Sequence, residues 1–198
     1  MKNNKHTCSW PKGDPLLTTY HDTEWGVPLH NDKKLFEFLI IEGFQAGLSW
    51  LTVLKKRENF RKAFDNFDFN KIATYDQRKI NSLLQDSGII RNKLKIESAI
   101  TNAKAFIEVR KEFGTFNTYT WKFTGNRQIH NGFESLKEIP AKTELSDLIS
   151  KDLKKRGFKF AGSTIVYAHM QATGMVNDHI KSCFRYKEII EKYGQQIV

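Results

Sequence analysis

Hydrophobic side chains recur at helical spacing along most of this 198-residue chain, with polar positions between them. A period of three to four residues predicts amphipathic helices. Such helices are expected over residues 33–42, 48–64, 76–84, 92–113, 146–156 and 162–174, and a further one is expected to begin at an Asn177 cap. Residues 115–142 are rich in turn formers and aromatic residues and show no clear period. The predicted fold class is all-α.

Length and composition indicate a globular protein. A chain of this size buries roughly 70% of the surface that its unfolded form exposes, so a core can form without disulfides. We expect one domain over residues 1–186 and a C-terminal tail over 187–198, and two helical lobes with a pocket between them remain an alternative. No apolar stretch approaches the ~20 residues that cross a bilayer, and the N-terminus lacks an apolar signal core. A cytoplasmic protein with no membrane partner is expected.

The charge balance narrows the choice of partner. There are 32 Lys and Arg against 22 Asp and Glu, for a formal net charge of +10. A basic excess favours a polyanion such as nucleic acid, although many soluble proteins carry a similar charge and bind none. The two cysteines lie near opposite ends of the chain, and in a reducing compartment thiols or metal ligands are expected rather than a disulfide.

One carboxylate falls on the apolar face of its predicted helix. Glu42 comes three residues after Leu39 and four after Phe38. Because an unpaired buried carboxylate is costly, Glu42 either reaches water at a helix end beside Gly43 or meets a cation or hydrogen-bond donor in a pocket. The segment 43–50 has two glycines and a tryptophan, which favours a tight turn beside an aromatic-lined concave site.

Residues 83–95 resemble a helix-hairpin-helix motif. Gly88 supplies a turn that few residues tolerate, and the isoleucines that follow it can enter the core. The next helix then begins with free backbone N–H groups, which together with Arg91, Lys93 and Lys95 can hold a phosphate without reading sequence. An ordinary helical turn with a terminal glycine gives the same pattern, so both interpretations stay open.

Four possible metal ligands lie at the two ends of the chain. Cys8 and His21 are 13 positions apart, and His179 and Cys183 are spaced i, i+4, which would place them on one face of a helix. Two thiolates and two imidazoles complete a tetrahedral, structural zinc site. Alternatively, the cysteines are small core residues and the histidines lie at the surface.

Eight short motifs, in order from Cys8 to Cys183, resemble the bacterial 3-methyladenine DNA glycosylase I family. They are Cys8-Ser9-Trp10, Asp14-Pro15, residues 20–28, residues 42–50, residues 54–57, residues 88–91, residues 155–160 and residues 176–179. The resemblance implies an all-α helix-hairpin-helix glycosylase. Such an enzyme flips 3-methyladenine out of alkylated double-stranded DNA and hydrolyses its N-glycosidic bond, which leaves an abasic site.

The resemblance also implies roles for individual residues. Glu42 would be the catalytic candidate and would hydrogen-bond the extruded base, while Tyr20 and Trp50 stack on it with Trp10 nearby. One structural zinc would be held by the four Cys and His residues at the chain ends. The residues implied or predicted to contact DNA are Gly47, Leu48, Gly88, Arg91 and Lys93.

Two features of the sequence differ from the pattern of its relatives. Many relatives in this superfamily carry an Asp some twenty residues beyond the hairpin, whereas no Asp occurs between Ser87 and Ser146. An alkylated, cationic base is already a good leaving group, so a narrow substrate range is expected. The tail from residue 184 is longer than the family pattern.

Three other functions remain possible from the sequence. They are a lesion-binding protein without catalysis, an alkyl transferase with a free cysteine, and a lyase with a lysine amine. A monomer is expected.

Overall fold

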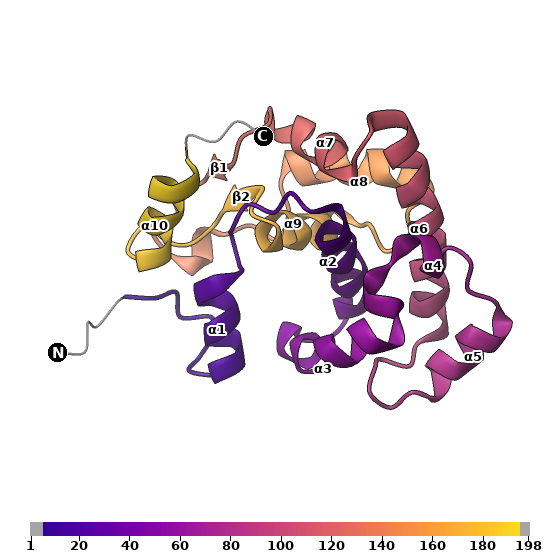
Figure 1. The fold of residues 1–198 in the computed structure, drawn as a ribbon. Helices are drawn as coiled ribbons and strands as arrows, with labels where there is room; N and C mark the ends of the chain where they lie inside the picture. Colours follow the sequence, from indigo (N-terminus) through magenta and orange to yellow (C-terminus); the bar gives the residue numbers. More distant parts are fainter. Residues whose placement is uncertain (1–5, 195–198) are drawn as a thin grey trace.

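The structure, a computed structural model, describes residues 6–194. It is almost entirely helical (Figure 1), which confirms the all-α prediction. The α-helices are α1 Pro15–Thr23, α2 Asp32–Gln45, α3 Trp50–Ala63, α4 Phe69–Ile72, α5 Gln77–Gln85, α6 Lys93–Phe113, α7 Phe116–Trp121, α8 Glu144–Lys155, α9 Ser163–Ala172 and α10 Phe184–Tyr193. Short 3-10 turns are η1 Asp65–Phe67, η2 Lys122–Thr124 and η3 Leu136–Glu138. The strands β1 Ile129–His130 and β2 Val176–Asn177 pair in parallel.

Side-chain caps begin several helices where the sequence predicts. The side chains of Asn31, Asp76 and Asn92 accept hydrogen bonds from the first turns of α2, α5 and α6. The helix expected to end at Gly43 instead runs to Gln45. Gly43 lies in the last turn of α2, and a Cβ there would make only an ordinary contact of 3.4 Å with Phe160.

The C-terminal helix begins later than predicted. Asn177 lies in strand β2 rather than at a helix start, and its side chain bonds the backbone of His179 and Tyr186. α10 starts only at Phe184. The sequence analysis also missed α1, in which the Asp14 side chain accepts from the first-turn N–H groups.

Helix α2 forms the centre of the core. It packs against α3, α6, α7 and α9, and Leu35, Phe36 and Ile41 on it are fully buried. A helix that is apolar on nearly every side must be surrounded by other elements. The position of Glu42 on this helix therefore fixes its carboxyl group inside the protein.

The two ends of the chain meet on one side of the molecule. In Figure 1, α1 and α10 lie beside each other at the left, although more than 160 residues separate them in sequence. Ile189 of α10 is fully buried, so this helix extends packed structure beyond the expected boundary at residue 186. Residues 195–198 of the predicted tail lie outside the described residues, and the domain limits stay a prediction. No helix within residues 6–194 is long and apolar enough to span a membrane.

Candidate active site and metal centre

A cavity of about 350 Å³ opens between α1, α2, α3, α9 and the η3 turn. It brings together Trp10, Tyr20, Glu42 and Trp50, which the sequence places at four separate positions. The complete lining is Trp10, Tyr20, Trp25, Glu42, Gln45, Trp50, Leu136, Ile139, Ala168 and Gln171. The size and the mixture of flat apolar rings with one acid are typical of a pocket for a small planar ligand.

The aromatic rings contact one another around this cavity. The ring centroids of Tyr20 and Trp50 are 5.2 Å apart with planes tilted by 48°. Trp10 meets Trp25 edge to face at 5.3 Å and Tyr20 at 6.4 Å. Contacts of this kind hold large rings rigidly, and electron-rich ring faces attract a flat cation.

Glu42 supplies the acidic group of the pocket. Its side chain is only 4% exposed, and its Oε2 atom has no hydrogen-bond partner among the described residues. Burial raises the pKa of Glu42 to about 8, although the positive charge of Arg57 acts in the opposite direction. At neutral pH the carboxyl group can therefore exist as a hydrogen-bond donor or as an anion, depending on what enters the pocket.

An ion-pair network with Arg57 and Glu37 at its buried centre lies close to the pocket. The Arg57 guanidinium donates to Glu37 at 2.6 Å and to Glu24 at 2.7 Å, and Arg61 also pairs with Glu37 and Glu58. Burial would lower the pKa of Arg57, but the two carboxylates raise it above its usual value. The network fixes a permanent cation whose field favours the ionised form of the pocket acid.

A second, enclosed cavity of about 20 Å³ adjoins Glu42 on its inner side. Thr120 and His169 line it, and within residues 6–194 neither the Thr120 hydroxyl nor the His169 ring nitrogens have a partner. Burial lowers the pKa of His169 to about 4, so this ring is neutral at physiological pH. A space of this size holds no more than about one water molecule. A ligand can therefore reach Glu42 only through the larger cavity.

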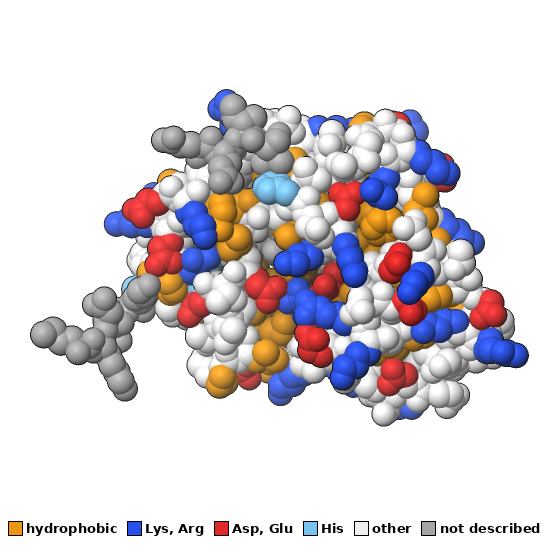
Figure 2. Space-filling view, viewed as in Figure 1, with side chains coloured by type: hydrophobic (Ala, Val, Ile, Leu, Met, Phe, Trp, Pro, Cys, Tyr) orange, Lys and Arg blue, Asp and Glu red, His pale blue; other side chains and the backbone are white. Residues whose placement is uncertain are grey.

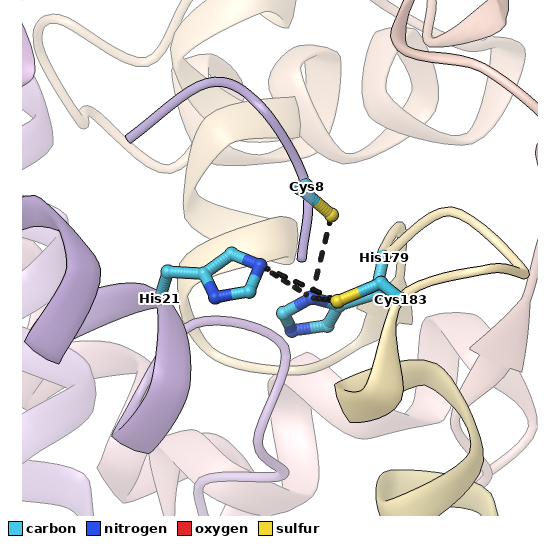
Figure 3. Close-up of side chains that lie close together, drawn as sticks. All are labelled: Cys8, His21, His179 and Cys183. Atoms are coloured by element: carbon cyan, nitrogen blue, oxygen red, sulfur yellow. Dashed lines mark hydrogen bonds between the residues drawn. The ribbon is translucent and has the colours of Figure 1, made fainter. Parts of the chain in front are cut away.

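The predicted metal ligands converge at the meeting point of the chain ends. Cys8, His21, His179 and Cys183 are buried, and their ligand atoms lie within 4.8 Å of one another (Figure 3). The Sγ atoms lie 3.6–3.7 Å from Nδ1 of His179, and this nitrogen lies 3.1 Å from Nε2 of His21. Zinc bonds of about 2.0–2.3 Å would place tetrahedral ligand atoms roughly 3.3–3.8 Å apart. The cluster can therefore hold a metal ion.

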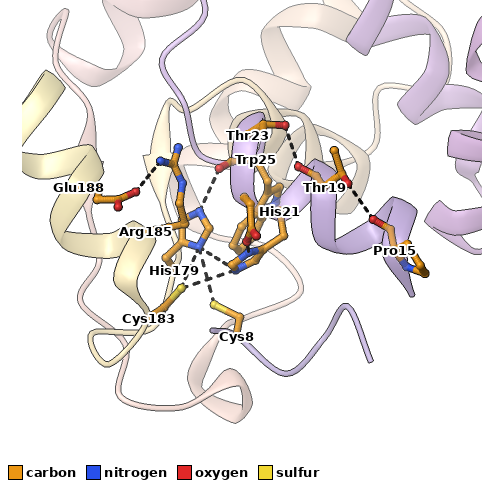
Figure 4. A network of polar contacts seen from close by, with 11 residues as sticks. Cys8, Pro15, Thr19, His21, Thr23, Trp25, His179, Cys183, Arg185 and Glu188 are labelled. Carbon is orange, nitrogen blue, oxygen red and sulfur yellow. Dashed lines mark hydrogen bonds and ion pairs between the residues drawn. The ribbon is translucent and has the colours of Figure 1, made fainter. Parts of the chain in front are cut away.

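The outer nitrogens of the two histidines have their own partners. His21 Nδ1 lies 2.6 Å from an Asp22 oxygen. His179 Nε2 lies 3.0 Å from the Trp25 carbonyl, as Figure 4 shows. Both acceptors favour a proton on the outer nitrogen, which leaves the inner nitrogen free to bind a cation. The helical explanation for the His179 and Cys183 spacing is wrong, because both residues precede α10 in a loop with a turn that closes at Cys183.

Residues 86–92 form the turn between α5 and α6. The Gly88 N–H donates to Asp86 Oδ1 at 2.7 Å, and a Cβ on Gly88 would lie only 2.9 Å from the same oxygen. A larger residue there would displace the Asp86 carboxylate and break this hydrogen bond. Gly88 does not have the positive φ that the predicted turn would need, so close packing rather than backbone conformation favours glycine. Ile89 enters the core as predicted, and Arg91 and Lys93 are exposed beside the turn. The expectation that Lys95 lies beside them is wrong, because Lys95 is buried and its Nζ donates to the carbonyls of Phe44 and Ala46.

The turn between α2 and α3 carries the other predicted DNA contacts. Gly47 has φ +81° and open space around it, and Leu48 is 41% exposed. On the face shown in Figure 2, Lys and Arg side chains alternate with Asp and Glu, so the basic excess is not gathered into one patch there.

Several pocket residues were not assigned by the sequence analysis. Trp25 and Gln45 lie within the motifs of residues 20–28 and 42–50, and their closeness in sequence to Tyr20 and Glu42 was the available signal. Ile139 comes from the segment without a clear period. Ala168 and Gln171 are spaced i, i+3 on α9, and this apolar helix gave no sign that one face borders a cavity.

Comparisons with known proteins agree on one family. A sequence model described as methyladenine glycosylase matches residues 10–186. DNA-3-methyladenine glycosylase 1 of Escherichia coli is 49% identical over 90% of this chain and 96% of its own length. DNA-3-methyladenine glycosylase of Haemophilus influenzae is 46% identical over 89% and 95%.

Solved structures give the same result. A crystal structure of 3-methyladenine DNA glycosylase I is 48% identical and superposes with a TM-score of 0.88, over 90% of this chain and 98% of the other. The Staphylococcus aureus enzyme, in a study of 3-methyladenine recognition, is 32% identical with a TM-score of 0.88 over 90% and 95%. Together with these matches, the helical fold and the cavity lined by an acid and aromatic rings identify the class of protein as DNA glycosylases. This chain belongs to the methyladenine glycosylase family.

Proposed function

We propose that the protein is a DNA repair glycosylase that flips 3-methyladenine out of alkylated double-stranded DNA and excises it. Hydrolysis of the N-glycosidic bond releases the free base and leaves an abasic site, with no cut in the strand. The cavity that joins Glu42 to the rings of Tyr20 and Trp50 is the observation that carries this proposal. The names of the family's relatives support it.

The damaged base binds by charge and shape. 3-Methyladenine is cationic as a nucleoside, so the aromatic rings and the Glu42 carboxyl group stabilise it more than they stabilise neutral adenine. Extrusion costs a few kcal/mol and is easiest at a weakened pair, which adds selectivity before the pocket is reached. The cationic base is also a good leaving group, so the protein need contribute less to bond cleavage, and a narrow substrate range follows.

Gly47 and Leu48 enter the gap that the extruded nucleotide leaves in the duplex. The hairpin turn at Gly88 anchors the phosphate backbone through N–H groups at the start of α6, with Arg91 and Lys93 beside it. The open surroundings of Gly47 and the exposed Leu48 side chain support the first role. The exposure of the two basic side chains supports the second.

One structural zinc binds Cys8, His21, His179 and Cys183. The ligand spacing and the acceptors on both outer imidazole nitrogens support zinc rather than four unrelated core residues. Four protein ligands leave no open position, so the ion stabilises the fold and takes no part in hydrolysis. The thiolates would then be unavailable for alkyl transfer. A monomer in the bacterial cytoplasm stays a prediction.

The test is incubation with methylated duplex DNA, followed by chromatography of the released bases. Release of 3-methyladenine, with strands intact until alkali is added, is expected. Binding without release would indicate a lesion-binding protein, and strand cleavage without alkali would indicate a lyase. Release of hypoxanthine as fast as 3-methyladenine would contradict the narrow substrate range.

A Glu42→Gln variant separates two roles of the acid. Normal binding of free 3-methyladenine with lost turnover would assign Glu42 to chemistry, and loss of both would assign it to recognition. Glu108→Gln, on an exposed part of α6, is the matched control and should behave like the wild type.

A further inference from the structure

Lys95 is a buried cation whose acceptors are both main-chain carbonyls. Its residue is 7% exposed, and its Nζ donates to the Phe44 carbonyl at 2.8 Å and to the Ala46 carbonyl at 2.6 Å. Burial lowers the pKa of this ammonium group. A cation in such a place is stabilised by the partial negative charge of carbonyls at the C-terminal end of α2.

The two elements that Lys95 connects belong to different parts of the proposed DNA interface. Lys95 is the third residue of α6, directly after the hairpin turn of residues 86–92. The carbonyls that it binds lie at the end of α2, directly before Gly47 and Leu48. The side chain therefore spans from the proposed phosphate anchor to the turn that would fill the duplex gap.

A second lysine makes a similar connection in the opposite direction. Lys56 of α3 donates from its Nζ to the carbonyls of Ser87 at 2.9 Å and Gly88 at 3.3 Å. Lys95 of α6 thus binds the backbone at the turn between α2 and α3. Lys56 of α3 binds the backbone at the turn between α5 and α6. Two such links restrain the turns from moving independently.

We propose that Lys95 is a positioning residue that fixes the Gly47 and Leu48 turn to the hairpin, so that binding of the phosphate backbone drives Leu48 into the duplex. This inference rests on the proposed function. In this role Lys95 acts through the protein backbone, because its residue is buried and its Nζ is directed at the two carbonyls. Its effect is on extrusion of the base and not on the base pocket or on the overall charge of the interface.

The test is a Lys95→Met variant, with Lys104→Met on the exposed middle of α6 as the matched control. Excision from methylated duplex should fall by about ten- to a hundredfold in Lys95→Met and remain unchanged in the control. Binding of free 3-methyladenine, measured by quenching of tryptophan fluorescence, should stay within about twofold of wild type. The fluorescence of 2-aminopurine placed opposite the lesion, which reports local unstacking, should rise less than with wild type.

Two further measurements separate positioning from other roles. The slope of log Kd against log salt for duplex binding should be unchanged in Lys95→Met, whereas Lys93→Met should reduce it by about one unit. In a Leu48→Ala background, Lys95→Met should cause little additional loss of excision, since both act through the same turn. Lys56→Met breaks the second link at a half-buried site and should give the same selective loss, even if Lys95→Met does not fold.

Three results would overturn the inference. They are an unchanged rate of duplex excision in both variants, a loss of free-base binding in proportion to excision, and a reduced salt slope in Lys95→Met. Each assumes that the wild-type protein releases 3-methyladenine. A wild type that releases no base would instead refute the proposed function.

Discussion

At the scale of single residues, Glu42 places a carboxyl group in a site that is shielded from solvent. The periodicity of its helix predicted that the side chain faces the core, and the structure confirms this. Whether it reaches a pocket could not be decided from periodicity, because the other walls of the cavity come from α1, α3 and α9. Long-range packing determines the surroundings of the acid, and helical spacing determines only its direction.

Replacement of Glu42 by Gln should change the pH dependence of stability. The pKa of Glu42 is raised from 4.5 to about 8 in the folded protein, so the wild type loses stability as pH rises through this range, because only the unfolded state ionises freely. The Gln variant cannot ionise. Its free energy of unfolding relative to wild type should therefore increase by up to about 1 kcal/mol per pH unit between pH 5 and 8.

Urea denaturation of both proteins at several pH values measures this difference. Glu108→Gln, whose side chain is exposed, should follow the wild-type curve. Parallel curves for wild type and Glu42→Gln would show that the carboxyl group is hydrated in solution and is not held in a closed pocket.

At the scale of elements, the sequence predicted helices well where a capping side chain precedes an apolar stripe. α5 and α6 begin at the expected caps, and α6 ends at Gly114 as predicted. Asn177 is an asparagine like the Asn92 cap of α6, but it lies in a strand. Its side chain instead forms hydrogen bonds with the backbone of His179 and Tyr186, which order the loop before α10. A cap residue indicates a local hydrogen-bonding role, and tertiary contacts decide whether a helix follows.

Gly174, just after the end of α9, lies where the neighbouring main chain leaves no room for a side chain. It has φ +69°, and a Cβ there would lie 2.3 Å from the Val27 carbonyl carbon. Gly174→Ala should therefore lower the free energy of unfolding by about 3 kcal/mol or more, from both backbone strain and overlap with main-chain atoms. Gly125 has φ +65° with open space, so Gly125→Ala should cost only about 1 kcal/mol.

Guanidinium denaturation measures the free energy of unfolding of the two glycine variants, and the comparison is valid if their m-values are equal. Equal losses would mean that the contact between α9 and the segment after α1 is loose in solution. That contact also orders the loop carrying Trp25, so the Gly174→Ala variant should bind free 3-methyladenine less tightly as well.

At the scale of the whole molecule, the Cys and His cluster joins the two ends of the chain. The four residues that the sequence indicated as metal ligands do converge, but the predicted helical geometry is wrong, since His179 and Cys183 come from a loop. Spacing alone could not show which pairs meet, because that depends on the contact of α1 with the segment before α10. The Trp25 carbonyl that accepts from His179 also connects the cluster to a residue of the base pocket.

Removal of the metal should therefore affect both stability and base binding. We expect about one zinc per chain, and its complete removal by a chelator should cost about 3 kcal/mol or more, which lowers Tm by roughly 6–12 °C. Because Tyr20 and Trp25 flank His21, free 3-methyladenine should also bind more weakly, and added zinc should restore both properties. His21→Ala should reproduce the loss, whereas His30→Ala, at an exposed site outside the cluster, should not. A metal-free protein with an unchanged Tm and unchanged base binding would show that the cluster does not require an ion to hold the chain ends together.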